Sequence, residues 1–178
     1  MSLQGVRASI VDRLQSALGG AARAKAHGGR FSLAELKRHA VQGPAVLVAC
    51  LGVVKLTPAA AGVEALCAWG AFVVCADKPL LPRDAAALGL VSAMLPLVPG
   101  QTWERDDVDQ PRQVRADNLY TSELDKEGVA LWALTWQQEI TLGQVDPATL
   151  DAFLTAHVDY DINQDGSADA ADDIALPQ

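Results

Sequence analysis

ADNLYTSELDKEGVALWALTWQQEITLG, residues 116–143, is the segment from which the rest of the fold is best inferred. It predicts one β-strand, a short polar connection at 122–128 and a long second strand. Side chains in the second strand alternate with period two, and one face carries Ala130, Trp132, Leu134, Trp136 and Ile140. The opposite face is apolar only in its first half. This pattern is typical of a central strand that runs past the edge of its own core.

Two tryptophans four residues apart give that face a large apolar area. Trp132 and Trp136 can together bury about 300–500 Å², which contributes about 8–12 kcal/mol as an upper bound. A helix or another subunit must therefore cover this face. We expect Trp132, Trp136 and Ile140 to contribute to a contact between subunits.

Apolar runs and turn residues predict the remaining elements. Helices are expected at 5–18, 32–39 and 83–95, and strands at 44–52, 63–77, 112–120 and 129–142. Residues 54–62 are expected to form a connection with some extended structure, and Gly70 in mid-strand indicates that something packs closely against the backbone. The order of elements predicts an α+β fold with a single antiparallel, mostly four-stranded sheet and helices packed on one face.

The segment GGAARAKAHGGR, residues 19–30, is basic and has glycines at both ends. It predicts a flexible loop that presents Arg23, Lys25 and Arg30. Two interpretations are open, a solvated connection or a loop that docks on an acidic partner. Directly after this segment, Ser32 and Glu35 have the spacing of a capping box and predict the start of a helix.

Charge is distributed unevenly along the 178 residues, whose formal net charge is −8. Residues 1–144 hold all 14 Lys and Arg and 14 of the 22 acidic residues, whereas 145–178 hold the other 8 acidic residues. We therefore predict a core domain at 1–144 and an acidic C-terminal extension at 145–178. The lack of a concentrated basic surface argues against sequence-specific binding of nucleic acid. No run is long and apolar enough to predict a membrane partner.

The usual catalytic patterns are missing from the sequence. There is no glycine-rich phosphate loop, no G-x-S-x-G motif and no pair of histidines at metal-binding spacing. Cys50, Cys67 and Cys75 lie in apolar runs without paired spacing, which indicates buried thiols in a reducing compartment. We therefore expect a protein that is not an enzyme.

One motif points to a metal ion, which would be Ca²⁺. Residues 161–172 form a twelve-residue loop with oxygen-bearing side chains at positions 1, 3, 5, 9 and 12 and a glycine at position 6. The candidate ligands are Asp161, Asn163, Asp165, Ser167 through its carbonyl, Asp169 and Asp172. The segment resembles an EF-hand-like loop or one half of a dockerin repeat, although Asp172 replaces the long bidentate glutamate. The alternative interpretation is a solvated acidic turn.

The block VRADNLYTSELDKEGVALWALTWQQEITLG, residues 114–143, resembles a family of small Mu-like phage and prophage proteins encoded between the head and tail genes. The matching residues are Asn118, Leu119, Tyr120, Asp125, Gly128, Val129, Ala130, Leu131, Trp132, Trp136 and Gly143. The resemblance implies a tail-completion role and a tail-terminator-like fold. Such proteins form a ring, usually a hexamer, on the last layer of the tail tube and offer a face to the head connector. The family has no catalytic residues to transfer.

This resemblance places the protein in the tail or neck of a virion that is assembled in the cytoplasm of a bacterial host. Its expected partners are copies of itself, the tail-tube protein and a connector or neck protein. In a head-to-tail ring each subunit presents one edge and receives another, so the basic 23–30 loop and the acidic 159–173 segment are expected to face different partners. The alternatives are a neck adaptor one layer higher and a calcium-stabilised binding module.

Overall fold

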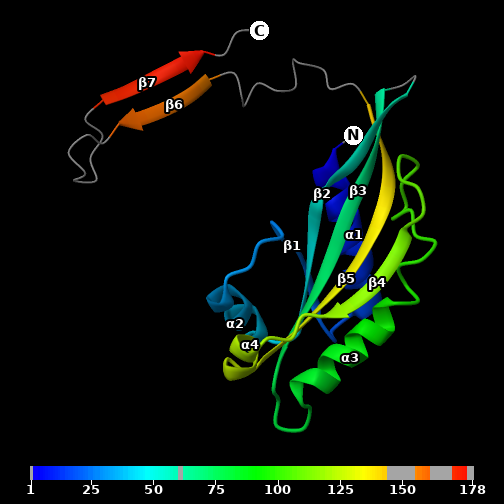
Figure 1. Ribbon diagram of the computed structural model, residues 1–178, viewed down its shortest axis with the longest axis vertical. Helices are drawn as coiled ribbons and strands as arrows, with labels where there is room; N and C mark the ends of the chain where they lie inside the picture. Colours follow the sequence, from blue (N-terminus) through cyan, green and yellow to red (C-terminus); the bar gives the residue numbers. More distant parts are fainter. Residues whose placement is uncertain (1, 60–61, 144–154, 161–169, 176–178) are drawn as a thin grey trace. The chain divides into compact units, whose positions relative to one another are not determined.

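Two long antiparallel strands, β3 (Gly62–Ala76) and β5 (Val129–Leu142), form the centre of the sheet (Figure 1). β2 (Ala45–Ala59) pairs antiparallel with the other side of β3. β1 (Arg23–Ala26) and β4 (Arg112–Asn118) are the two edges, and the strand order is β1-β2-β3-β5-β4. The computed structural model describes residues 2–59, 62–143, 155–160 and 170–175.

The chain divides into two compact units, Met1–Gly143 and Gln144–Gln178. The five-stranded sheet belongs to the first unit. In the described part of the second unit, β6 (Thr155–Tyr160) and β7 (Ala170–Ala175) pair as antiparallel strands. The sequence analysis assigned no strand to this acidic segment.

The α+β class is confirmed, but the sheet is mixed and has five strands instead of four. The additional strand is β1, which runs parallel to β2 and places Lys25 beside Leu47. The sequence analysis interpreted this segment as a flexible loop, because four residues are too few to show a strand period. Pairing with β2 is a tertiary contact, and it overrides the weak preference of this short segment for a loop.

β2 is longer than predicted. It continues past Gly52 to Ala59, so β2 and β3 form a hairpin with strands of 15 residues each. Gly52 and Pro58 look like turn residues in the sequence. The strand accommodates Gly52 at a bulge, and it accommodates Pro58 because no other described strand pairs with that side of β2 there. The predicted connection at 54–62 is therefore mostly strand.

The main core lies between the sheet and two helices, α1 (Leu3–Leu18) and α3 (Arg83–Met94). α1 begins at Ser2, whose hydroxyl accepts the Gly5 N–H at 3.2 Å. Along α1 the buried side chains are spaced four residues apart, namely Val6, Ile10, Leu14 and Leu18. They pack in one cluster with Trp69 and Leu134 of the sheet and with Met94 of α3. This face matches the single helical layer that was predicted.

The opposite face also carries helices, which corrects the prediction of helices on one face only. α2 (Leu33–Val41) and α4 (Ser122–Lys126) bury Leu36 and Leu124 in a second cluster with Phe72 and Leu131. The Ser32 cap of α2 is confirmed, because its hydroxyl accepts the Glu35 N–H at 3.2 Å. α4 was predicted as a polar connection, since five residues are too few to reveal a helical period.

Two glycines on β3 are required by close packing. A Cβ on Gly70 would lie 2.9 Å from the ring of Phe72, which confirms the expectation that something packs against this backbone. Gly62 has φ +139°, and a Cβ there would overlap the carbonyl of Leu142 on β5. Gly62 therefore lets the β2–β3 hairpin stay paired with β5 near its outer end.

Candidate functional site

The predicted interface set on β5 divides between the interior and the surface. Trp136 is only 2% exposed and Ile140 is fully buried, both in the core beneath α1 and α3. The expectation that they contact another subunit is therefore corrected, because their own chain covers them. Trp132 is only partly buried and remains accessible near the edge of the sheet.

A fully buried glutamine explains why β5 keeps a polar residue on its apolar face. Gln138 Oε1 accepts the indole N–H of Trp103 at 2.7 Å and that of Trp136 at 3.1 Å. Its amide nitrogen donates to the carbonyls of Gln101 and Asp109. All of its hydrogen-bonding groups have partners, so the loop carrying Trp103 is fastened to β5. The sequence analysis missed this residue, since a lone polar residue in an apolar strand carries no local signal.

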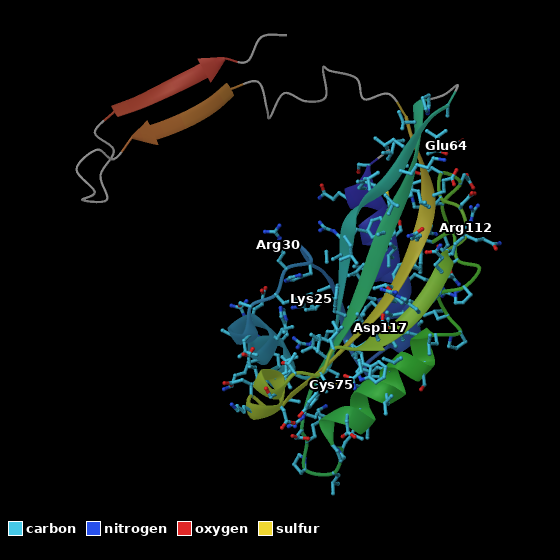
Figure 2. The ribbon with its side chains drawn as sticks, viewed as in Figure 1. Lys25, Arg30, Glu64, Cys75, Arg112 and Asp117 are labelled. Carbon is cyan, nitrogen blue, oxygen red and sulfur yellow. The ribbon has the colours of Figure 1, made fainter. Side chains whose placement is uncertain are left out.

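The basic segment is placed on and beside the edge strand β1. Arg23 is engaged within the chain, since its guanidinium donates to the Gln42 side chain at 3.0 Å and to backbone carbonyls near the end of α2. Lys25 and Arg30 are exposed on the β1 side of the sheet (Figure 2). We call Lys25 and Arg30 the basic edge.

The outer side of β1 is closed to strand pairing by a helix side chain. Gln15 of α1 accepts the Ala24 N–H at 2.8 Å and donates to the Ala22 carbonyl at 3.3 Å. An added strand would need these two backbone groups, and Gln15 already occupies them. The basic edge therefore offers charged side chains, and not backbone groups, to a partner.

A cluster of aromatic and ionisable side chains holds the segment after β1. The ring of His27 stacks on Phe31 with centroids 4.3 Å apart, and its Nε2 lies 3.0 Å from the Glu35 carboxylate. The hydrogen bond to His27 lowers the pKa of Glu35. His39 lies edge-on to His27, and burial lowers the pKa of His39. Nδ1 of His39 is buried, and no described residue is hydrogen-bonded to it.

The outer half of the β2–β3 hairpin exposes large apolar side chains. Leu56 is 61% exposed and Val54 is 55% exposed. The full set, which we call the apolar arm, is Leu51, Val53, Val54, Leu56 and Val63. Among the described strands, β1 covers the outer side of β2 only from Ala45 to Val48, so the backbone beside the arm also lacks a strand partner.

A pocket of about 310 Å³ lies between the start of α3, the start of β5 and the end of β4. We call it the acidic pocket; the side chains that matter here are Asp77, Arg83, Asp84, Tyr120, Asp125 and Trp132. Arg83 donates to Asp77 at 2.8 Å and also pairs with Asp125. The pocket is lined by three carboxylates and one guanidinium, which leaves an excess of negative charge.

The aromatic wall of this pocket comes from the block that carries the phage resemblance. Tyr120 is 64% exposed, and Trp132 on β5 is partly buried. The side chain of Asn118 accepts the Tyr120 N–H at 3.1 Å, and this hydrogen bond holds the backbone between the two residues in a turn. The sequence analysis named Trp132 but missed the carboxylates, since Asp77, Asp84 and Asp125 come together only through the fold.

The thiols are not equally buried, which corrects one expectation. Cys50 is partly exposed, whereas Cys67 and Cys75 are buried. A hydrogen bond from Cys67 lowers the pKa of Cys50 to about 6, and the same contact raises the pKa of Cys67. Burial raises the pKa of Cys75 to about 11.

The calcium prediction falls mostly outside the described residues. Asp161, Asn163, Asp165, Ser167 and Asp169 lie there, and Asp172 lies on β7 opposite Val158. Within the described ranges no three His, Cys, Asp or Glu side chains are grouped to hold a metal ion. In the same ranges no helix is long and apolar enough to cross a membrane.

Comparison with known proteins does not add to these observations. The chain matches no protein-family model, and no curated protein is significantly similar to it. The resemblance of residues 114–143 to Mu-like phage proteins therefore stays a prediction.

Proposed function

We propose that this chain is a structural phage virion protein, a tail terminator or tail-completion protein. It forms a ring, with six copies as the expected number, at the head-proximal end of the tail tube and joins the tail to the head connector. It acts by binding copies of itself, the tail-tube protein and the connector or neck protein, and it catalyses no reaction. It assembles in the cytoplasm of the bacterial host and ends in the tail or neck of the virion.

The apolar arm is the observation that carries this proposal. Its five side chains are exposed on the outer half of a long hairpin, beside a strand edge that lacks a partner among the described strands. Such a surface is a template for association, and monomeric proteins normally cover or charge it. Contact with a neighbouring copy or with the end of the tube would remove it from water.

The two edges of the sheet also suit a ring. One edge ends in the exposed Lys25 and the other ends beside the acidic pocket, so they are different surfaces. Unlike surfaces form head-to-tail contacts, and repeated head-to-tail contacts close into a ring when the rotation permits.

The test is the mass of the particle in solution, measured by light scattering with and without purified tail-tube protein. We expect the wild type to form a ring alone or on the tube, and Leu56→Glu combined with Val54→Glu to stay monomeric and folded. Leu80→Glu is the control, since Leu80 is 97% exposed but lies outside the arm. A wild type that stays monomeric even with tube protein would contradict the proposal.

A chelator separates this proposal from a calcium-stabilised binding module. Ring assembly that is unchanged by EDTA is expected of a terminator, whereas loss of the folded state on adding EDTA favours the calcium module. Electron micrographs of particles containing the protein separate a terminator from a neck adaptor, because the two occupy successive layers.

A further inference from the structure

The basic edge and the acidic pocket lie at opposite edges of the sheet, in neighbouring rows of its register. The register runs from Lys25 on β1 through Leu47, Phe72 and Ala133 to Asp117 on β4. The neighbouring row ends with Trp132 and Asn118, which line the acidic pocket. Figure 2 shows Lys25 and Arg30 on the β1 side and Asp117 on β4. The basic edge and the acidic pocket therefore lie at nearly the same height along the strands.

These surfaces are too far apart to meet within one molecule. Five neighbouring strands span four spacings of about 4.8 Å, so the two edges are about 19 Å apart. One lysine or arginine side chain does not reach across that distance. A contact between the basic edge and the acidic pocket therefore requires two molecules.

The acidic pocket has the chemistry that binds a lysine or arginine side chain. Its carboxylates exceed its single guanidinium by two, and Asp84 projects from the first turn of α3 on the exposed surface. Tyr120 and Trp132 supply aromatic faces, which attract cations over their rings. Charge-assisted hydrogen bonds to the carboxylates would then orient the bound side chain.

The basic edge carries side chains of the kind that the acidic pocket can bind. Lys25 and Arg30 are exposed, whereas Arg23 is already used within the chain. Because Gln15 already occupies the Ala24 N–H and the Ala22 carbonyl, the exposed side chains are what this edge offers to a partner. Long flexible stems allow both residues to extend beyond the edge of the sheet.

We propose that the basic edge of one copy docks in the acidic pocket of the next copy, with Lys25 and Arg30 approaching Asp84, Asp125, Tyr120 and Trp132. This inference rests on the proposed ring and names its subunit junction. When neighbouring copies are related by rotation about an axis parallel to the strands, each row of residues stays at the same level along that axis. The basic edge of one copy then faces the acidic pocket of the next. The junction is head-to-tail, since the two surfaces differ.

Reciprocal charge reversal tests the junction. Lys25→Glu and, separately, Asp84→Lys are each expected to stay folded by circular dichroism and to raise the concentration of half-assembly by about tenfold. Arg30→Glu should act in the same direction. Arg112→Glu is the matched control, because it makes the same change in charge at an exposed side chain of β4 that lies outside both surfaces. It should leave assembly unchanged.

Mixing the two reversed variants is the decisive step. In a head-to-tail ring that alternates Lys25→Glu with Asp84→Lys, every junction joins opposite charges, so the mixture should assemble like the wild type. Failure of the mixture to recover, or normal assembly of either variant alone, would overturn this inference and leave the ring proposal standing. A wild type that stays monomeric with and without tail-tube protein would overturn both.

Discussion

Gln138 illustrates how a single polar residue can organise an apolar face. It is fully buried on β5, and it supplies the hydrogen-bond acceptor for two tryptophan indoles and a donor for two loop carbonyls. Buried polar groups without partners are costly, so these five groups depend on one another.

Gln138→Ala should lower the free energy of unfolding by about 3 kcal/mol or more. The substitution leaves the N–H groups of Trp103 and Trp136 without an acceptor and opens a cavity beside them. Chemical denaturation followed by tryptophan fluorescence measures the change. Gln137→Ala, on the partly exposed opposite face, should change stability by less than about 0.5 kcal/mol. Equal effects of the two substitutions would contradict the role given to the hydrogen bonds of Gln138.

His39 should make stability depend on pH in mildly acidic solution. Burial lowers its pKa in the folded state, so below about pH 6.5 the unfolded chain takes up a proton that the folded chain resists. Stability is therefore full above pH 6.5 and falls as the pH is lowered. Urea titrations at several pH values should give a shallower fall for His39→Gln than for the wild type. Identical slopes would show that His39 does not contribute.

The β2–β3 hairpin is the longest part of the sheet that leaves a group of large apolar side chains exposed. In its outer half β2 leaves Val53, Val54 and Leu56 exposed, whereas Ala65 and Cys67 of β3 are buried in the main core. Two register shifts in β2 increase the local twist of the strand. The hairpin keeps its place through pairing of β3 with β5, and this pairing depends on Gly62 near the tip.

Gly62→Ala should loosen the outer end of the hairpin and cost about 1–3 kcal/mol. The new Cβ meets a positive φ and also overlaps the Leu142 carbonyl, so the backbones of β3 and β5 must separate. Hydrogen exchange should quicken at the Leu142 end of β5 and not at its Val129 end. Gly20→Ala is the control, since nothing lies within 4 Å of its added Cβ.

For the whole molecule, the two proposed contacts should respond differently to salt. The junction between the basic edge and the acidic pocket is electrostatic and exposed, whereas the contact of the apolar arm is hydrophobic. Salt screens the former over a Debye length that shrinks from about 10 Å at 0.1 M to about 3 Å at 1 M. Hydrophobic contacts are not screened in this way.

Raising NaCl from about 0.1 M to about 1 M should therefore raise the half-assembly concentration of the wild type about tenfold. The mixture of Lys25→Glu and Asp84→Lys should show the same dependence, because it also joins opposite charges. Light scattering over a concentration series measures both. Assembly that strengthens steadily with salt would indicate that the apolar arm alone holds the ring.

Periodicity predicted the elements that are long enough to display it. α1, α3, β3 and β5 were located within a few residues, because each buries one face along several periods. β1 and α4 were missed, since four or five residues contain about one period. β2 was cut short at Gly52, because the tolerance of a glycine or proline in a strand depends on what pairs with its edges.

The residues of the candidate site also divide into those that the sequence predicted and those that only the fold brought together. The sequence identified Lys25, Arg30 and Trp132, since charge and aromatic size are properties of single residues. It assigned Trp136 and Ile140 to the surface, because alternation separates two faces of a strand but does not say what covers them. The acidic pocket was not predictable, since Asp77, Asp84 and Asp125 come from three separate segments.

Local pattern was thus enough to establish the α+β class and the long central strands of this protein. The position of the helices on both faces, the sealed edge at β1, the exposed arm and the acidic pocket came only from the folded chain. The physical reason is the range of the interactions. Hydrogen bonds and burial within one element repeat along the sequence, whereas edges, pockets and exposed faces depend on which distant segments pack together.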